Sequence, residues 1–306
     1  MDTVIAVDNL RRSYDGAPAV RDVTFSVAKG EIFGILGPNG AGKTTTVESL
    51  QGLRSRDGGV VEVLGIDPAR HPDRLRRRIG AQLQSAALPD RLRVGEAVSF
   101  FARLQQRPVD VARTLDEWDL TGLRRRAFAT LSGGQRQRLF LALALLGEPE
   151  VVFLDELTAA LDPSARRATW ELVRRVRDRG ATVVLVTHFM EEAQALCDRV
   201  AIIHDGRIVA LDTPAALTAR SGGDVRVTFT ANGQSLDFLG QLPTVTSVTI
   251  GDHLITVTGP PTSPVHVAAA LADRGIVPAD FRTHHPTLED VFLGITGRSL
   301  IREVST

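Results

Sequence analysis

A glycine-rich turn between a short apolar run and a helix-like stretch constrains the fold more than any other feature of this chain. Residues 32–36, Ile-Phe-Gly-Ile-Leu, have the apolar and β-branched composition of a buried strand, and residues 43–50 are typical of a helix. The turn fits the pattern G-x-x-x-x-G-K-S/T, and its residues are Gly37, Pro38, Asn39, Gly40, Ala41, Gly42, Lys43 and Thr44. Because lysine occurs only at positions 29 and 43, a chance match is of the order of one in a thousand. The sequence therefore predicts a phosphate-binding loop.

The residue types of this loop suit a nucleoside triphosphate. Its glycines let successive backbone N–H groups turn inward and surround phosphate oxygens, and the following helix adds its positive N-terminal end. Lys43 is expected to reach the β- and γ-phosphates, and the hydroxyl of Thr44 is expected to bind Mg²⁺. We expect Thr45 to contact the nucleotide with them. The loop thus predicts a site for ATP and Mg²⁺.

A second motif follows about a hundred residues later and complements the loop. Residues 151–154 form an apolar strand that ends in Asp155 and Glu156. At the carboxyl end of a parallel strand such side chains emerge beside a phosphate loop. Asp155 suits the Mg²⁺ ion, and Glu156 suits a general base that orients the attacking water. An apolar strand followed by Asp-Glu is common by itself, so the pairing with the loop is what makes the motif specific.

Composition excludes several classes of protein. The chain has 306 residues, of which 43% are hydrophobic and 24% charged, and this length suits two unequal globular domains. Lys+Arg and Asp+Glu both number 36, which weighs against a protein held to nucleic acid by bulk charge. The longest apolar runs fall short of the roughly 20 residues that span a bilayer. No secretory signal is visible, and the single cysteine, Cys197, excludes an internal disulfide or a cysteine-based metal cluster. We expect a cytosolic chain.

The patterning predicts two domains. Strands at 4–7, 23–27 and 32–36 open the chain, a helical pattern follows from 74 to 148, and strands at 151–154 and 182–186 flank a helix at 162–179. Fully apolar strands that alternate with helices imply a parallel sheet covered on both faces. We expect an α/β domain over residues 1–220, with an antiparallel β subdomain and a helical insertion near 82–149. A small α+β domain is expected over 224–306, with a strand at 225–230, a hairpin of 245–250 and 254–257, a helix at 265–271 and a strand near Phe281.

At this point the sequence resembles a known family, the ATP-binding cassette (ABC) ATPases. The run Leu131-Ser132-Gly133-Gly134-Gln135 matches the signature motif of that family, and it precedes the Asp-Glu strand as it should. The resemblance covers nearly all of residues 1–220 and implies the ABC cassette form of the P-loop NTPase fold. It also implies a head-to-tail dimer, in which Ser132 and Gly134 of one subunit contact the γ-phosphate held by the loop of the other.

Further site residues are implied by the same resemblance. Tyr14 stands where an aromatic ring stacks on adenine, and Asp162 matches an aspartate that crosses the dimer interface. Gln84 matches the glutamine that senses Mg²⁺ and the attacking water and transmits the nucleotide state to a membrane partner, with Gln82 as the alternative. His188 matches the histidine that bonds the γ-phosphate and the general base. The expected catalytic residues are therefore Glu156, His188 and Lys43.

The sequence departs from the family pattern at three positions. Leu157 stands where the family usually has proline, Ala160 where it usually has glycine, and Ser85 where an acidic residue is common after the glutamine. None of these changes removes a phosphate-contacting or catalytic group, so we expect hydrolysis to survive. The change at Ala160 is expected to stiffen the interface loop and to alter how the two sites couple.

The C-terminal residues 286–293, Pro-Thr-Leu-Glu-Asp-Val-Phe-Leu, resemble the ending of cassette subunits from bacterial drug and antibiotic exporters of the daunorubicin-resistance type. Leu288, Val291 and Phe292 are also spaced to pack an amphipathic helix against its domain. The resemblance implies an ATPase on the inner face of the membrane that drives export through a separate integral-membrane permease. Which compound is exported, and whether the dimer is homomeric or heteromeric, stay open, although a complete set of site residues favours a homodimer.

The rival reading is a cassette ATPase that acts on ribosomes or nucleic acid instead of a transporter. Translation-factor types carry two cassettes in tandem, whereas this chain has one phosphate loop. Chromosome-maintenance types insert a long coiled coil, whereas about 110 residues without sustained heptads separate the loop from the Asp-Glu strand here. The sequence therefore favours transport and no nucleic-acid partner.

Overall fold

The structure of the protein is a computed structural model, which describes residues 2–82, 87–105, 107–158, 161–220, 224–231, 235–251 and 254–296. Gln84, Ser85 and Ala160 lie outside the described residues. The chain forms two compact units that divide between Pro214 and Ala215, a few residues before position 220. No helix in the described part of the chain combines the length and the apolar character needed to cross a bilayer.

The first unit opens with an antiparallel sheet of order β2-β1-β4. Its strands are β1 (Thr3–Tyr14), β2 (Ala17–Ala28) and β4 (Gly58–Val63). The first two extend well beyond the predicted runs at 4–7 and 23–27. Register shifts within the pairing of β1 and β2 allow this, because bulges let pairing continue where the apolar alternation breaks. The predicted antiparallel β subdomain is confirmed.

The six-stranded sheet of this unit has the order β5-β6-β7-β3-β8-β9. Its strands are β3 (Ile32–Leu36), β5 (Ile79–Gln82), β6 (Val151–Asp155), β7 (Thr182–Thr187), β8 (Arg199–His204) and β9 (Arg207–Asp212). The pairs from β5 to β8 are parallel, and β8 pairs with β9 antiparallel. Every residue of β3, β6 and β7 is buried, as expected for central strands of a sheet covered on both faces. The α/β fold class predicted for this domain is confirmed.

One part of the helical prediction is wrong. Residues 79–82 lie inside the stretch from 74 to 148 that we expected to be helical, yet they form β5, paired in parallel with β6 from Ile79 opposite Val151. The segment Ile-Gly-Ala-Gln carries one β-branched residue and no alternation, so its strand conformation comes from the neighbouring strand and not from local propensity.

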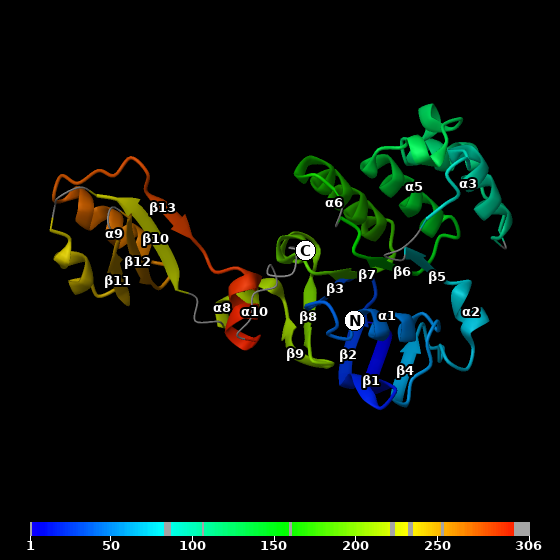
Figure 1. Cartoon of the computed structure of the whole chain (residues 1–306), viewed down its shortest axis with the longest axis horizontal. Helices are drawn as coiled ribbons and strands as arrows, with labels where there is room; N and C mark the ends of the chain where they lie inside the picture. The colour runs from blue at the N-terminus through cyan, green and yellow to red at the C-terminus, as the bar shows by residue number, and fades with distance from the viewer. Residues whose placement is uncertain are drawn as a thin grey trace. The chain divides into compact units, whose positions relative to one another are not determined.

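Helices of the first unit connect and cover these strands. They are α1 (Lys43–Leu50), α2 (Pro72–Arg76), α3 (Val94–Arg103), α4 (Val111–Glu117), α5 (Gly133–Leu145), α6 (Pro163–Asp178) and α7 (Met190–Leu196). Asp162 caps α6 by accepting hydrogen bonds from the N–H groups of Ser164 and Ala165, and Pro163 begins the helix. Figure 1 shows α3 and α5 at one end of the unit and the three-stranded sheet at the other.

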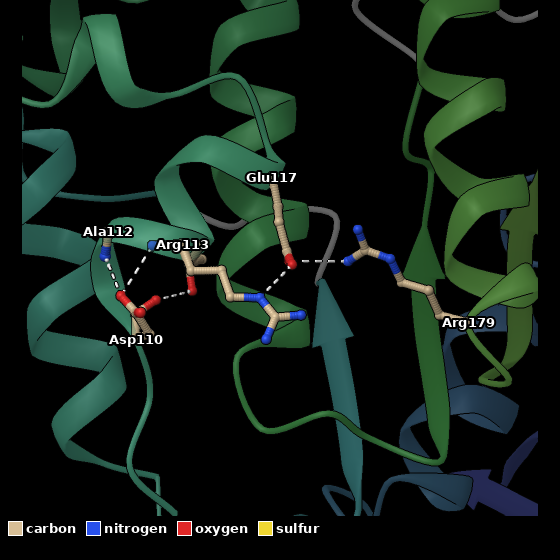
Figure 2. Close-up of polar contacts among 6 residues, drawn as sticks. Asp110, Ala112, Arg113, Glu117 and Arg179 are labelled. Carbon is tan, nitrogen blue, oxygen red and sulfur yellow. Dashed lines mark hydrogen bonds and ion pairs between the residues drawn. The ribbon is translucent and has the colours of Figure 1, made fainter.

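Two ion pairs that share one carboxylate link α4 to the connection between α6 and β7. Glu117, the last residue of α4, contacts Arg113 of the same helix at 2.8 Å and Arg179, which follows α6, at 3.2 Å (Figure 2). The hydrogen bond from Arg113 lowers the pKa of the Glu117 carboxyl below its ordinary value, and the charge of Arg179 adds to this effect. The carboxylate therefore stays ionised between two cations.

The second unit holds an antiparallel sheet of order β11-β12-β10-β13. Its elements are α8 (Pro214–Arg220), β10 (Val225–Thr230), β11 (Ser247–Ile250), β12 (Leu254–Gly259), α9 (Ser263–Ala272), β13 (Arg282–His284) and α10 (Leu288–Thr296). Val227 and Phe229 of β10 form one core with Val257 of β12 and with Val267 and Leu271 of α9. The alternation of β10 and the hairpin of β11 and β12 agree with the prediction. In α10, the side chains of Leu288, Val291 and Phe292 are buried.

Candidate nucleotide-binding site

The carboxyl ends of four strands meet at one edge of the six-stranded sheet. Strands β5, β6, β7 and β3 are neighbours and run in parallel, and ligands of such sheets bind outside the carboxyl edge. The phosphate loop follows β3, Asp155 ends β6 and Glu156 follows it, and His188 follows β7. Leu36 lies opposite Thr187, so the loop and His188 begin at the same level. The topology thus brings together three motifs that are far apart in the sequence.

The glycines of the loop are required by its close contacts. At Gly37, an added Cβ would lie 2.1 Å from the carbonyl oxygen of Ile203, and at Gly42 it would lie 2.3 Å from the carbonyl oxygen of Ala19. Both glycines also have positive φ angles, 154° and 100°. A side chain at either position would push the loop away from β8 or β2, so the tight turn before α1 depends on glycine.

Lys43 lies inside the turn that it follows. Its Nζ donates hydrogen bonds to the carbonyl oxygens of Gly37 at 2.8 Å and Pro38 at 2.9 Å, and the residue is 6% exposed. Burial lowers the pKa of the Lys43 ammonium, while the negative charges of Glu156 and Asp155 oppose this shift. The ammonium is therefore held in the loop and within the field of the two carboxylates. Thr44, by contrast, is exposed at the start of α1.

The two carboxylates at the end of β6 differ in environment. Asp155 is 7% exposed, and burial, with the charge of Glu156, raises its pKa to about 6 although Lys43 opposes the shift. Glu156 has a φ angle of 48°, the left-handed region that non-glycine residues rarely adopt, and its N–H donates to the carbonyl of Val186 at 2.9 Å. Such backbone strain is concentrated at functional sites.

His188 contacts the second of these carboxylates. Its Nδ1 lies 3.1 Å from Oε1 of Glu156, and the imidazole is one-third exposed. The ring of Phe189 lies 4.1 Å from the imidazole, centroid to centroid, at an angle of 38° between the planes, and the guanidinium of Arg166 lies over the Phe189 ring at 4.4 Å. The histidine is thus oriented by a carboxylate and by a neighbouring aromatic ring.

Tyr14 ends β1 beside the first turn of α1. Its hydroxyl lies 3.4 Å from Oγ1 of Thr45, and the guanidinium carbons of Arg12 and Arg54 lie 5.1 and 5.3 Å from the centre of its ring. Arg12 also pairs with Asp57 at 2.7 Å. Sequence reasoning missed both arginines. The position of Arg12, two residues before Tyr14 on the same face of a strand, was a usable signal, whereas Arg54 had none.

The remaining predicted residues lie at other places. Ser132 and Gly134 are at the start of α5, where Ser132 caps the helix and exchanges two hydrogen bonds with Gln135, at 3.0 and 3.3 Å. No hydrogen bond joins either residue, or Asp162, to the phosphate loop within the described part of the chain. Gln82 ends β5 and is 7% exposed, and its Oε1 has no hydrogen-bond partner among the described residues.

One buried carboxylate near this edge was not predicted. Glu192 of α7 is fully buried and lies four residues after His188. A usable signal was present, because Glu192 stands four residues before Leu196 and therefore on the apolar stripe of its helix.

Comparison with known proteins places this geometry in a family. The family model for ABC transporters matches residues 20–159. The chain is 39% identical to the daunorubicin resistance ATP-binding protein DrrA3 of Streptomyces coeruleorubidus, over 97% of this chain and 96% of the relative. It is 32% identical to the linearmycin resistance ATP-binding protein LnrL of Bacillus subtilis (strain 168), over 97% and 99%. It is 38% identical to the Nod factor export ATP-binding protein I of Paraburkholderia xenovorans (strain LB400), over 98% and 99%.

Solved structures agree with these relatives. The ATP-binding subunit of an ABC transporter superposes with a TM-score of 0.64 at 28% identity, covering 78% of this chain and 98% of that one. A second cassette from an ABC transporter, at 21% identity and a TM-score of 0.61, covers 69% and 92% and supports the fold alone. The match of residues 20–159 and the near-complete alignment with three relatives show that this chain belongs to the ATP-binding subunits of ABC transporters, a family whose general activity is ATP hydrolysis.

Proposed function

We propose that this chain is the ATPase subunit of an exporter and that it drives a drug-like or antibiotic compound out through a separate integral-membrane permease. The observation that carries the ATPase part is the Glu156–His188 contact beside the loop that holds Lys43. The export part is supported by relatives that are named for daunorubicin resistance, linearmycin resistance and Nod factor export. The protein would act at the cytoplasmic face of the membrane, bound to that permease.

The residues at the sheet edge fit a magnesium ion. Mg²⁺ prefers one or two carboxylates together with hydroxyl, phosphate and water oxygens. Asp155 is a buried carboxylate whose pKa is raised to about 6, so its charge is poorly compensated by the protein and would be favoured by a divalent cation. Asp155 and Thr44 would hold the ion, with Gln84, or alternatively Gln82, as a sensor. When bound, Mg²⁺ neutralises negative charge on the phosphate oxygens.

The chain's own groups account for the remaining chemistry. The N–H groups of the loop and the N-terminus of α1 bind the phosphates, with Lys43 on the β- and γ-phosphates and Tyr14 against the adenine. Glu156 orients the attacking water and accepts its proton. Because Nδ1 of His188 contacts Glu156, Nε2 is the ring nitrogen left to contact the γ-phosphate. Hydrolysis then depends on how these side chains are positioned.

We further propose that two copies of the chain form a head-to-tail homodimer with ATP at the interface. Ser132 is exposed at the start of α5, a helix of 13 residues, so its N-terminal end offers a second anion site to the γ-phosphate of the other subunit. Gly134 and Asp162 also lie at the starts of helices and would cross the same interface. Two complete sites would close and reopen together and switch the permease between its inward- and outward-facing states.

Recovery of the tagged chain from mildly solubilised membranes of its own host tests this function. We expect a polytopic membrane protein at a stoichiometry close to one to one. The Lys43→Ala variant is a suitable control, because it should retain the partner while losing ATP binding. Ribosomal proteins or DNA in place of the membrane protein would overturn the transport proposal in favour of a non-transport cassette ATPase.

A further inference from the structure

The buried carboxylate of Glu192 is hydrogen-bonded in an unusual way. The residue is 0% exposed, and one oxygen, Oε1, accepts both of its hydrogen bonds. One comes from Oγ1 of Thr158 at 2.8 Å, and the other comes from Nε1 of Trp170 in α6 at 3.1 Å. The second oxygen, Oε2, is buried and has no partner among the described residues. Through this single oxygen, Glu192 joins α7 to α6 and to the segment that contains Thr158.

Packing alone does not require a carboxylate at this position. Both donors are neutral groups, and Oε2 has no partner among the described residues. Burial of a carboxyl group with an unpaired oxygen is unfavourable. A glutamine would accept the same two hydrogen bonds through its amide oxygen. The position therefore requires an acceptor for Thr158 and Trp170, and the two hydrogen bonds fix both residues against α7.

Thr158 belongs to the segment that carries the proposed general base. It stands two residues after Glu156, is fully buried, and follows the apolar side chain of Leu157. Glu156 itself has a left-handed backbone, which persists only where the surrounding structure holds it. The backbone N–H of Glu156 donates a hydrogen bond to the carbonyl oxygen of Val186. The next polar side chain after Glu156 is that of Thr158, and it is hydrogen-bonded to Glu192 of α7.

The segment that follows β6 and the segment that follows β7 are joined by two contacts, one after the other along the chain. Strands β6 and β7 are parallel neighbours, so the residues that follow them leave the sheet side by side. In the first, Glu156 contacts His188 at 3.1 Å. In the second, Thr158 contacts Glu192, which stands four residues after His188, at 2.8 Å.

We propose that Glu192 is a positioning residue for ATP hydrolysis: through Thr158 it fixes the segment after Glu156 against the helix after His188, and so keeps the carboxylate and the imidazole in contact. This inference rests on the roles proposed above for Glu156 and His188. Glu192 acts on these two groups through its hydrogen bond with Thr158.

Four variants of the full chain test the proposal. Thr158→Val removes the donor hydroxyl with little change in volume, and Glu192→Ala removes the acceptor. Glu192→Gln is the conservative variant, because it keeps an oxygen for the same two hydrogen bonds. Trp170→Phe is the matched control, because it removes the other hydrogen bond to the same oxygen and leaves Thr158 bonded. Each variant is examined for melting temperature, for kcat and KM of ATP hydrolysis in the membrane complex, and for the imidazole NMR signal of His188 in the isolated full chain.

We expect Thr158→Val and Glu192→Ala to lower kcat by about ten-fold or more, with KM for ATP nearly unchanged, because misplacement of a catalytic group slows the chemical step. The double variant should be no slower than either single variant, since the two residues act as one unit. The single variants Thr158→Val and Glu192→Ala should both shift the imidazole signal of His188 in the same direction as the Glu156→Gln variant does. Glu192→Gln should restore most of the rate, and Trp170→Phe should lower the melting temperature without either effect.

The outcomes separate this inference from the proposed function. A folded Thr158→Val protein with the wild-type kcat and an unmoved His188 signal would overturn the positioning role, even if Glu156→Gln abolishes turnover. Equal losses of kcat in Thr158→Val and Trp170→Phe would also overturn it, because they would indicate a general packing effect. A Glu156→Gln protein with the wild-type rate would instead remove the proposed function on which the inference rests.

Discussion

The carboxylate of Glu156 contacts the imidazole of His188, with 3.1 Å between Oε1 and Nδ1, although 32 positions separate the two residues in the chain. The contact exists because β6 and β7 are parallel neighbours and each is followed directly by one of these residues. Replacement of either side chain consequently changes the environment of the other, and each of them is tested best by a substitution that preserves its shape.

Glu156→Gln should therefore abolish most of the turnover and leave ATP binding intact. The amide keeps the size of the carboxylate but cannot accept a proton from water, and a general base contributes on the order of 10²–10⁴-fold to a rate. ATP hydrolysis measures the loss, and gel filtration with ATP should reveal a stable dimer that retains nucleotide. Hydrolysis near the wild-type rate would rule out the role of Glu156.

Lys43→Ala should weaken ATP binding and abolish hydrolysis. The ammonium is the positive group within the loop, where it is bonded to the carbonyl oxygens of Gly37 and Pro38. Calorimetry of ATP binding is the measurement, and Lys29→Ala is the control, because Lys29 is exposed and is the only other lysine of the chain. Equal ATP affinity in the two variants would contradict the assignment of the loop.

Asp155→Asn should stabilise the protein at neutral pH in EDTA without nucleotide. The folded-state pKa of Asp155 is raised from 3.8 to about 6, so the contribution of Asp155 to stability is most favourable below pH 4 and is lost as the pH rises through 6 and the buried carboxyl ionises. At 1.36 kcal/mol per pKa unit, the gain at pH 7.5 is about 2–3 kcal/mol.

Urea unfolding of Asp155→Asn and the wild type at pH 7.5 and at pH 4 measures this difference, most of which should be lost at the lower pH. With Mg²⁺ and ATP the order should reverse, because the wild type gains a bound ion that the variant holds poorly. A variant that is less stable than the wild type in EDTA at pH 7.5 would contradict the burial argument.

Glu117→Gln should cost less than about 1 kcal/mol of stability, because the carboxylate shown in Figure 2 is partly exposed and salt screens its partners. The pKa of Glu117 is lowered in the folded state, so its contribution is present above the ordinary value of 4.5 and is lost as the pH falls through the lowered pKa. Thermal melts at pH 7 should show the loss in low salt and not in 1 M NaCl.

Glu148→Gln is the matched control for Glu117→Gln. Glu148 pairs with Arg107 at 3.4 Å, but its side chain is 83% exposed against 29% for Glu117. A loss for Glu148→Gln equal to that for Glu117→Gln would show that the bridge to Arg179 adds nothing.

Much of the fold could be predicted because the deciding signals are local. The glycine turn, the apolar strands β3, β6 and β7 and the alternation of β10 are all visible in short windows of sequence. Strand β5 was not predictable in this way, since its four residues adopt the strand conformation by pairing with β6.

In the candidate site, too, some features could be predicted from the sequence and others depend on the fold. The resemblance to a family indicated that His188 and Glu156 act together, but their contact depends on the order of strands in the sheet. In α7, Glu191 and Glu192 are adjacent and chemically identical, yet the first has a side chain 75% exposed and the second is fully buried. Helix periodicity indicates that Glu192 is the one that turns inward, because it stands four residues before Leu196. Its partners Thr158 and Trp170, however, come from segments that the sequence does not place side by side.

The scarcity of lysine has a practical consequence for chemical labelling. Arginine does not react with common amine reagents, so an ester dye meets only two side-chain amines, an exposed one at Lys29 and one at Lys43 that is 6% exposed. Burial lowers the pKa of the Lys43 amine and so raises its nucleophilic fraction, while the loop limits access to it. The ratio of modification at the two lysines, read by mass spectrometry on the unmutated protein, therefore reports how completely the phosphate loop is covered, with Lys29 as the internal standard.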